Sequence, residues 1–149
     1  LAAAPDATPD AAQRVDWAAL LHEIGYTVSH IGFHKHGAYI LENADMPGFS
    51  ATEQRKLALL VMGCRGGLSK MAEMLNDPYV AAQVIALRLA VLFHHARRAI
   101  DTPRLVVKVG RHIRFAIAKR WLKAHPLTTH LLGVERSEWE AVDRPWRPA

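Results

Sequence analysis

Apolar residues recur at helical spacing in the first part of the chain, and a glycine marks the end of the first stripe. This stripe predicts an amphipathic helix that ends near Gly25, and it consists of Trp17, Leu20, Leu21 and Ile24. A second apolar segment at residues 38–41 predicts another helix, which a short turn would bring back beside the first. We therefore expect these two segments to pack against each other.

A capping motif opens the next predicted helix. Ser50 and Glu53 have the spacing of a capping box, in which each side chain accepts a hydrogen bond from the other residue's backbone N–H. One face of the helix is apolar and carries Leu57, Leu60, Val61 and Cys64. The helix should end at residues 65–67, Arg-Gly-Gly, because glycine readily adopts a left-handed exit. A short helix is expected around residues 71–75.

The longest predicted helix starts after Asp77, with Pro78 at the first helical position, and reaches about Arg98. It is apolar nearly all round, which is typical of a central buried helix. Arg88 interrupts this apolar surface, and a buried guanidinium needs a partner. A core carboxylate such as Glu23 would give a structural ion pair, and an anion site is the alternative.

The hydrophobic period changes after Pro103. Runs at 105–109 and 112–117 alternate or are rich in β-branched residues, which predicts a hairpin of two strands. Two helices follow, one at 119–124 and one from Thr128 or Thr129 to Glu140, with Trp139 buried. The predicted fold is therefore mainly α, with a small antiparallel β-sheet near the C-terminus.

Composition limits the number of domains. A chain of 149 residues, half of them apolar, makes one domain, and its apolar runs are too short to cross a bilayer. Residues 1–13 are rich in Ala, Pro and Asp and are expected to form a linker or tail, with the domain at 14–149. Leu1 in place of an initiator methionine indicates a piece of a longer protein. The single Cys64 is expected to be buried, and it fits a cytoplasmic setting.

The charge balance favours polyanionic partners. Nineteen Lys and Arg residues against fourteen Asp and Glu give a formal charge of +5, and long-range attraction then favours polyphosphate or nucleic acid. The basic residues are spread along the chain, and they do not alternate with aromatic residues as in a base-stacking platform. An ordinary solvated basic surface therefore remains the alternative.

Candidate chemistry concentrates in one stretch of fifteen residues. It contains four of the nine histidines and one acid, namely His22, Glu23, His30, His34 and His36. Because the first two residues lie near one helix end and the last two open the next helix, histidines from two helices could converge. The alternative is that His22 is a hydrogen-bonded core histidine and that the others line a polar cleft.

Three segments carry a resemblance to a known family: LLHEIG, SHIGFHKHGAYILENADMPGFS and IALRLAVLFHHARR. From about Trp17 to about Trp146 the chain resembles the C-terminal domain of bacterial exopolyphosphatases and guanosine pentaphosphate phosphohydrolases, the Ppx/GppA family. That domain is itself similar to the HD superfamily of metal-dependent phosphohydrolases. The resemblance implies an HD-domain-like helical bundle.

The resemblance also implies that the ancestral metal pocket is degenerate. HD enzymes hold divalent ions with histidines, a His-Asp pair and a later aspartate, and these ions activate water. Here the pair is His22-Glu23, with an acid one methylene longer, and Val91 stands where the resemblance places the closing aspartate. The implied pocket comprises His22, Glu23, His34 and Arg88, without a metal. The alternative is a surviving metal-dependent HD phosphohydrolase, in which His94 could substitute as a ligand.

We therefore expect no catalytic residue and no cofactor in this chain. The resemblance places the family's hydrolytic centre, and the magnesium it implies, in N-terminal actin-like domains outside the chain. The expected role is that of an accessory domain, which helps the full-length enzyme bind polyphosphate or guanosine pentaphosphate and contributes to a homodimer. Expected anion contacts are Lys35, His36, Arg65, Lys70, Arg97 and Arg98, since guanidinium forks suit phosphate and lysine supplies charge.

The charge of +5 favours long-chain polyphosphate over guanosine pentaphosphate, because binding strengthens with each phosphate neutralised. The remaining alternative is a purely structural dimerisation module.

Overall fold

The computed structural model describes residues 9–95 and 103–149. Its α-helices are α1 (Pro9–Leu21), α2 (Phe33–Asn43), α3 (Ala51–Gly63), α4 (Pro78–Phe93), α5 (Lys119–Ala124) and α6 (Pro126–Glu140). Three short 3₁₀ helices join them, namely η1 (Ile24–Thr27), η2 (Ser69–Met71) and η3 (Met74–Asn76). The strands are β1 (Val106–Val109), β2 (Ile113–Ala116) and β3 (Trp146–Pro148). The expectation of a mainly α fold with a small sheet near the C-terminus is confirmed.

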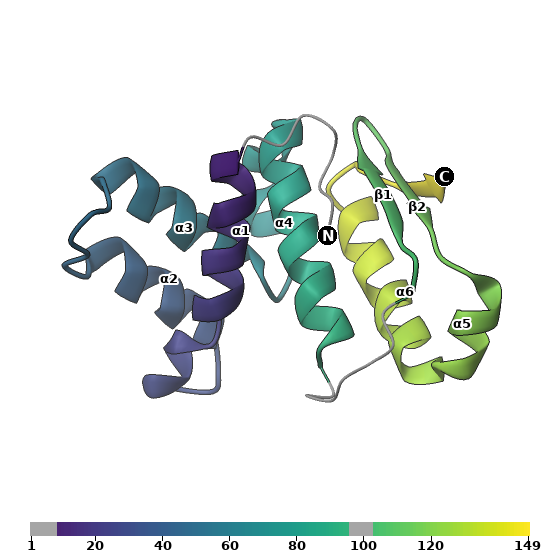
Figure 1. Cartoon of the computed structure of the whole chain (residues 1–149), viewed down its shortest axis with the longest axis horizontal. Coiled ribbons are helices and arrows are strands. Elements are labelled where there is room, and N and C mark those ends of the chain that lie inside the picture. Colours follow the sequence, from purple (N-terminus) through teal and green to yellow (C-terminus); the bar gives the residue numbers. More distant parts are fainter. Residues whose placement is uncertain (1–8, 96–102) are drawn as a thin grey trace.

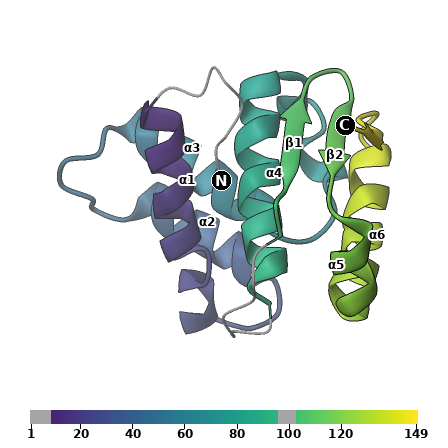
Figure 2. The ribbon, with the colours of Figure 1, turned by 45° about the vertical axis from the view of Figure 1, so that its right-hand side comes forward.

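Helix α4 lies at the centre of the molecule (Figure 1). Helices α1, α2 and α3 lie on one side of it, and α6 with the sheet lies on the other, an arrangement that the turned view in Figure 2 keeps. Val84, Leu87 and Leu89 of α4 are fully buried, so the prediction of a central buried helix is confirmed. The core is continuous from α2 to the sheet and includes Leu41, Leu57, Val61, Leu75, Ile113 and Trp139.

Local sequence signals explain how the helices begin. The Ser50 side chain accepts from the Glu53 backbone N–H at 3.2 Å, and Glu53 Oε2 accepts from the Ser50 backbone N–H at 2.9 Å. The predicted capping box is therefore confirmed. At the start of α4, Asp77 Oδ1 accepts from the Tyr79 backbone N–H at 2.8 Å, with Pro78 at the first helical position. Both helices start where the sequence predicted.

Gly25 allows η1 to lie directly against α2. A Cβ atom added at this glycine would lie 1.8 Å from the carbonyl oxygen of Phe33 and 2.6 Å from the backbone nitrogen of Gly37. No side chain fits there, because real Cβ contacts of this length do not occur. The close approach brings the residues that follow α1 beside the first turn of α2.

Several element boundaries differ from the sequence prediction. Helix α1 begins at Pro9, inside the segment expected to be a linker, and residues 1–8 lie outside the described part. Helix α4 ends at Phe93, five residues before the predicted end, because His94 leaves the helical conformation. Helix α6 begins at Pro126, whose missing N–H costs nothing in the first turn.

The sheet is mixed, which corrects the prediction of an antiparallel one. Strands β1 and β2 form the predicted antiparallel hairpin, and β3 adds a parallel neighbour to β2, in the order β1-β2-β3. The inner face packs through Ile113 and Trp146, both buried, and Phe115 stacks on Trp146 at a centroid distance of 4.5 Å. The buried guanidinium of Arg144 fixes the sheet to the helices by donating to the carbonyls of Gly110 and Asn76.

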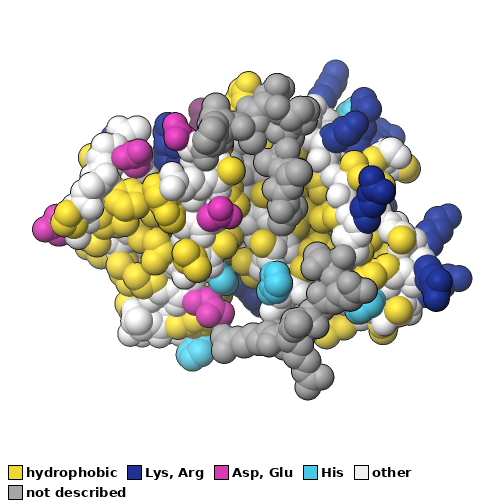
Figure 3. All heavy atoms as spheres, in the orientation of Figure 1, with side chains coloured by type: hydrophobic (Ala, Val, Ile, Leu, Met, Phe, Trp, Pro, Cys, Tyr) yellow, Lys and Arg dark blue, Asp and Glu magenta, His cyan; other side chains and the backbone are white. Residues whose placement is uncertain are grey.

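Like charges face one another on the outer side of the sheet. Lys108 lies opposite Arg114, and Arg114 lies beside Arg147, so three exposed cations form a row across the strands. Within the described residues, none of the three side chains has a hydrogen bond or an ion pair. Figure 3 shows Lys and Arg side chains gathered over this end of the molecule.

One buried ion pair joins the two halves of the core. Arg88 of α4 donates to Glu135 of α6 through Nε at 2.6 Å and through Nη2 at 2.9 Å, and both residues are buried. Arg88 Nη1 also donates to the carbonyls of Gly63 and Gly66, at 2.9 and 3.0 Å. A core carboxylate was expected, but Glu23 as its source was wrong. Glu23 is half exposed just after α1, whereas Glu135 lies on the buried face of α6.

None of the helices in residues 9–95 and 103–149 combines the length and the apolar composition that a membrane span needs.

Replacing Glu135 by Gln should lower the free energy of unfolding by about 3 kcal/mol, because it leaves the Arg88 charge buried without a counter-charge. Urea denaturation followed by circular dichroism measures this loss. Glu140→Gln is the matched control, since Glu140 pairs with Arg136 on the surface at 2.8 Å, and it should cost at most about 0.5 kcal/mol. Equal losses in the two variants would contradict the prediction.

Arg114→Thr should stabilise the fold by a few tenths of a kcal/mol, because it removes two like-charge contacts and threonine suits a strand. The denaturation midpoint should rise at low salt, and the gain should shrink at about 1 M salt, where charges are screened within roughly 3 Å. A gain independent of salt would assign the effect to strand propensity alone.

Candidate functional site

A cluster of basic groups surrounds Gly66. We call it the basic cluster, and it consists of His34, Lys35, Arg65, Lys70 and Arg88. A Cβ atom added at Gly66 would lie 3.4 Å from both His34 Nε2 and Lys70 Nζ, so these two groups close over the glycine. Lys70 Nζ also donates to the Arg65 carbonyl at 3.0 Å. The cluster is therefore a defined concentration of positive charge.

Three chain segments meet at the basic cluster. His34 and Lys35 lie in the first turn of α2, Lys70 lies in η2, and residues 63–67 connect the end of α3 to η2. Gly66 has a φ of +78°, which a glycine adopts without strain. Arg88 anchors this connection, because it donates hydrogen bonds to the carbonyls of Gly63 and Gly66. The buried ion pair thus fixes the loop that carries Arg65.

The electrostatics confirm a strong positive field at His34. The pKa of His34 is lowered to about 4, first by partial burial and then by the charges of Lys70, Lys35, Arg65 and Arg88. The pKa of Lys70 is also lowered, first by desolvation and then by Arg88, although the nearby Glu138 acts in the opposite direction. His34 is therefore neutral at pH 7, and the cluster holds more positive than negative charge.

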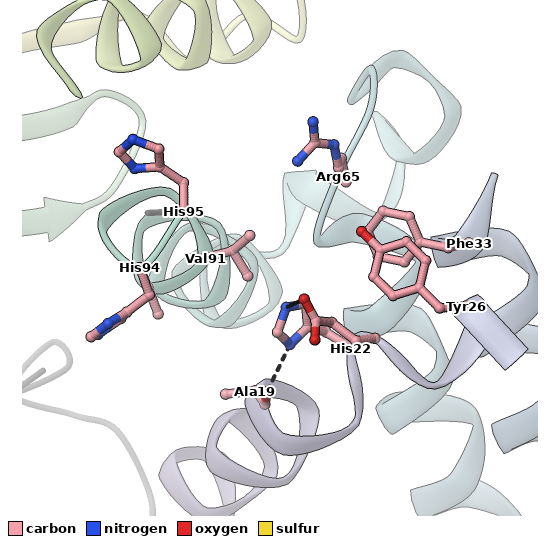
Figure 4. A pocket seen from close by; sticks show the side chains of 10 residues that line it. Ala19, His22, Tyr26, Phe33, Arg65, Val91, His94 and His95 are labelled. Atoms are coloured by element: carbon pink, nitrogen blue, oxygen red, sulfur yellow. Dashed lines mark hydrogen bonds and ion pairs between the residues drawn. The ribbon is translucent and has the colours of Figure 1, made fainter. Parts of the chain in front are cut away.

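A cavity of about 640 Å³ opens beside the cluster. We call it the histidine pocket, and its lining includes His22, Glu23, Tyr26, Phe33, Arg65, Val91, His94 and His95. Figure 4 shows His22 at the centre, the two aromatic rings on one side, Val91 and His94 on the other, and Arg65 at the edge. Arg65 also lines a second cavity of about 270 Å³, next to Arg88 and Glu135.

The residues expected to form a degenerate HD pocket are only partly together. His22, Glu23 and Val91 do line one pocket, with 4.0 Å between His22 Nε2 and Glu23 Oε1. His22 Nδ1 lies 2.7 Å from the Ala19 carbonyl, a contact that fixes the ring (Figure 4). His34 and Arg88 do not line this pocket, and they belong to the basic cluster instead.

The donor groups do not fit a divalent cation. Within residues 9–95 and 103–149, no three His, Cys, Asp or Glu side chains are grouped so that they could share a metal ion. In Figure 4 the ring of His94 points away from His22 across Val91, whose methyl groups cannot coordinate.

The structure brings together three of the six expected anion contacts. Lys35, Arg65 and Lys70 meet in the basic cluster. His36 lies two positions after His34 on α2, about 200° around the helix, and it is absent from the groups that act on His34. Arg97 and Arg98 lie outside the described residues.

Several site residues were not predicted from the sequence. Tyr26 and Phe33, with stacked rings at a centroid distance of 4.3 Å, form a wall of the histidine pocket. His95 lines both cavities. Cys64 is buried as expected, and burial raises its pKa to about 11, so its thiol stays protonated.

These features define a mainly helical domain that offers basic side chains next to a polar pocket. The family described as Ppx/GppA phosphatase, domain III, matches residues 3–136. The chain belongs to this family, and the resemblance drawn from its sequence motifs is confirmed.

Curated relatives agree with this assignment. The chain is 34% identical over 124 residues, 80% of its length, to a guanosine-5'-triphosphate,3'-diphosphate pyrophosphatase of Pseudoalteromonas translucida. It is 30% identical over 140 residues, 92% of its length, to a protein of the same name from Vibrio atlanticus. The matched regions are 25% and 28% of those proteins, so the chain spans about a quarter of the length of these relatives.

The lowered pKa of His34 should be visible in solution. Its ring resonance should titrate near pH 4 by NMR, and Lys70→Met should move the midpoint towards 6.5 by removing a neighbouring charge. Because the unfolded chain takes up this proton near pH 6.5, the contribution of His34 to stability is full above pH 6.5. It is lost as the pH falls towards 4. Lys56→Met is the control, and a midpoint near 6.5 in the unmodified chain would contradict the prediction.

Proposed function

We propose that this chain is the accessory C-terminal domain of a Ppx/GppA phosphohydrolase and that it helps to hold the phosphate-rich substrate. The single observation that supports this proposal best is the convergence of Lys35, Arg65 and Lys70 around Gly66. Three side chains from separate segments present positive charge to one place, where an anion would relieve their mutual repulsion.

The members of the cluster would act differently on a phosphate. Arg65 is exposed and can offer two parallel N–H groups to phosphate oxygens, and Lys35 and Lys70 supply charge. Neutral His34 has one N–H to donate. Arg88 is engaged with Glu135, so it would contribute its field to the site without contacting the anion. A bound phosphate would raise the pKa of both His34 and Lys70.

Two phosphate compounds fit this chemistry. The relatives are named for guanosine-5'-triphosphate,3'-diphosphate, whereas the charge of +5 favours long-chain polyphosphate. Both carry a row of phosphate groups, which is what the cluster would recognise. In the parent enzyme the release of a terminal phosphate, assisted by magnesium, would take place in other domains. This chain alone would then have no catalytic activity.

We also propose an HD-like origin for the histidine pocket, a homodimer and a cytoplasmic setting. The HD-like origin is supported by the shared lining of His22, Glu23 and Val91. Dimer contacts are supported by large apolar side chains left exposed around η1, with Leu20 at 82% and Ile31 at 87%. The cytoplasmic setting rests on the single, buried Cys64.

The double variant Arg65→Gln/Lys70→Gln should bind a linear polyphosphate about tenfold more weakly or worse, because two charge-assisted contacts are lost. Titration calorimetry at several salt concentrations measures the affinity, and the dependence on salt should become shallower. Arg55→Gln/Lys56→Gln removes the same charge from exposed positions on α3 and serves as the matched control.

The titration, together with measurements of oligomeric state, metal content and phosphoester hydrolysis, separates the competing functions. Equal weakening by both double variants would mean a general surface effect and would contradict the site. Dimerisation without salt-sensitive binding would favour a structural module. Stoichiometric manganese or iron together with phosphoester hydrolysis, both lost in His22→Ala, would favour a surviving HD phosphohydrolase.

A further inference from the structure

Charge is divided unevenly between the two parts of the chain that the structure describes. With His counted as neutral, residues 9–95 contain seven Lys and Arg residues and eight Asp and Glu, a net charge of −1. Residues 103–149 contain ten Lys and Arg and four Asp and Glu, a net charge of +6. The basic cluster around Gly66 belongs to the first part. The excess of positive charge therefore lies on another surface.

That surface is the outer side of the sheet together with α5, and we call it the basic face. Figure 3 shows Lys and Arg side chains gathered over this end of the molecule. Residues 103–134 contain seven Lys and Arg residues, all exposed, and no Asp or Glu. The four acids of residues 103–149 lie on α6 or just after it. The cations of the strands and of α5 therefore lack an acidic neighbour within their own segments.

The cations spread over the basic face in two directions. The row of Lys108, Arg114 and Arg147 crosses three strands, and because neighbouring strands lie about 4.8 Å apart, the row spans about 10 Å. Along β2, cations lie before the strand at Arg111 and after it in α5, which begins at Lys119. A single linear polyanion would follow only one of these directions. A nucleic-acid duplex is wide enough to contact both.

The width of the row fits the spacing of phosphates on a duplex. The major groove of B-form DNA is about 12 Å wide, and phosphates of the two strands border it. Lys108 and Arg147 stand at the two ends of the row, and their long side chains can reach one border each. Duplex DNA also concentrates negative charge, with about one charge per 1.7 Å of its axis.

The basic face offers charge without groups that read bases. The Phe and Trp rings of residues 103–149 are buried or half-buried, with Phe115 stacked on Trp146 and Trp121 stacked on His125. Unpaired bases bind proteins by stacking on exposed aromatic rings, so this face favours paired strands. The strands contain no Ser, Thr, Asn or Gln, uncharged residues that could contact the 2′-hydroxyls of duplex RNA. Both features favour DNA.

We propose that the basic face binds duplex DNA through its phosphates, without reading the sequence. Lys108, Arg114 and Arg147 neutralise phosphates on both sides of a groove, and the cations of α5 extend the contact along the duplex. Release of counterions supplies the affinity. Phosphates lying between the cations also relieve the repulsion of like charges across the strands. The binding surface is separate from the basic cluster and does not depend on the function proposed for that cluster.

The test follows the fluorescence anisotropy of a labelled DNA duplex of about two helical turns as the chain is added at several salt concentrations. The dissociation constant should be about 10⁻⁶ to 10⁻⁴ M at physiological salt, the usual range for sequence-independent binding, and lower at low salt. Lys108→Gln/Arg114→Gln should weaken binding about tenfold or more at low salt. It should also reduce the slope of log K against log salt by about 1.8, since each phosphate contact contributes about 0.9.

The matched control is Arg55→Gln/Lys56→Gln, which removes the same charge from exposed positions on α3. It should leave the affinity for DNA within about twofold at 0.1 M salt, where charges more than about 10 Å from a contact are screened. Circular dichroism checks that each variant is folded. The Lys108→Gln/Arg114→Gln variant should remain folded, because it removes like charges that face each other across the strands.

Three outcomes would overturn the proposal. The first is that the duplex does not bind in a salt-dependent way, and the second is that both double variants weaken its binding equally. The third is that single-stranded DNA, duplex RNA or linear polyphosphate of the same total charge binds more tightly than the DNA duplex. None of these results bears on the phosphate site at Gly66, which the Arg65→Gln/Lys70→Gln variant tests with polyphosphate.

Discussion

The buried guanidinium of Arg88 is the constraint on which the site depends. It joins α4 to the carboxylate of Glu135 on α6, and it also holds the carbonyls of Gly63 and Gly66. Desolvating an arginine is costly unless its donors and its charge are all matched. The carboxylate and the two carbonyls together satisfy it, and they tie the glycine loop after α3 to the buried helix α4. The exposed Arg65 therefore lies in a loop that Arg88 anchors on both sides, at Gly63 and at Gly66.

The net positive charge of the basic cluster depends on where the partner of Arg88 lies. Glu135 neutralises Arg88, but it lies on the far side of the guanidinium from the loop, so the cluster retains the charges of Lys35, Arg65 and Lys70. The pKa values of His34 and Lys70 are both lowered, first by desolvation and then by the neighbouring cations. A fold that concentrates unmatched positive charge at one place gains free energy when an anion arrives there.

Local signals in the sequence predicted most of the helices, whereas contacts between residues far apart in the chain were not predicted. The capping residues Ser50 and Asp77 mark helix starts through contacts within three residues, so their pattern is sufficient. Glu135 lies 47 residues from Arg88. In the structure Thr128, Leu132, Glu135 and Trp139 share one buried face of α6, and their spacing could have pointed to a buried carboxylate. Strand β3 contains Pro148 and is three residues long, too short for a period of two to appear.

The candidate site was predictable where its residues are neighbours in the chain. His34 with Lys35, and Arg65 with Lys70, stand close together in sequence, and the structure brings both pairs to Gly66. His36 lies two positions after His34 on α2 and faces another side of the helix. The aromatic wall of Tyr26 and Phe33 could not be predicted from the sequence, since isolated aromatic residues usually belong to the hydrophobic core.

Gly25 has a consequence for reading related sequences. The backbones of η1 and α2 touch at this position without room for any side chain, whatever ligand the protein takes. A glycine at this position in a distant relative would indicate only that the segments corresponding to η1 and α2 cross in the same way. A larger residue would mean that the segments have moved apart and that the wall carrying Tyr26 is built differently, so inferences about the pocket should not be transferred to such a protein.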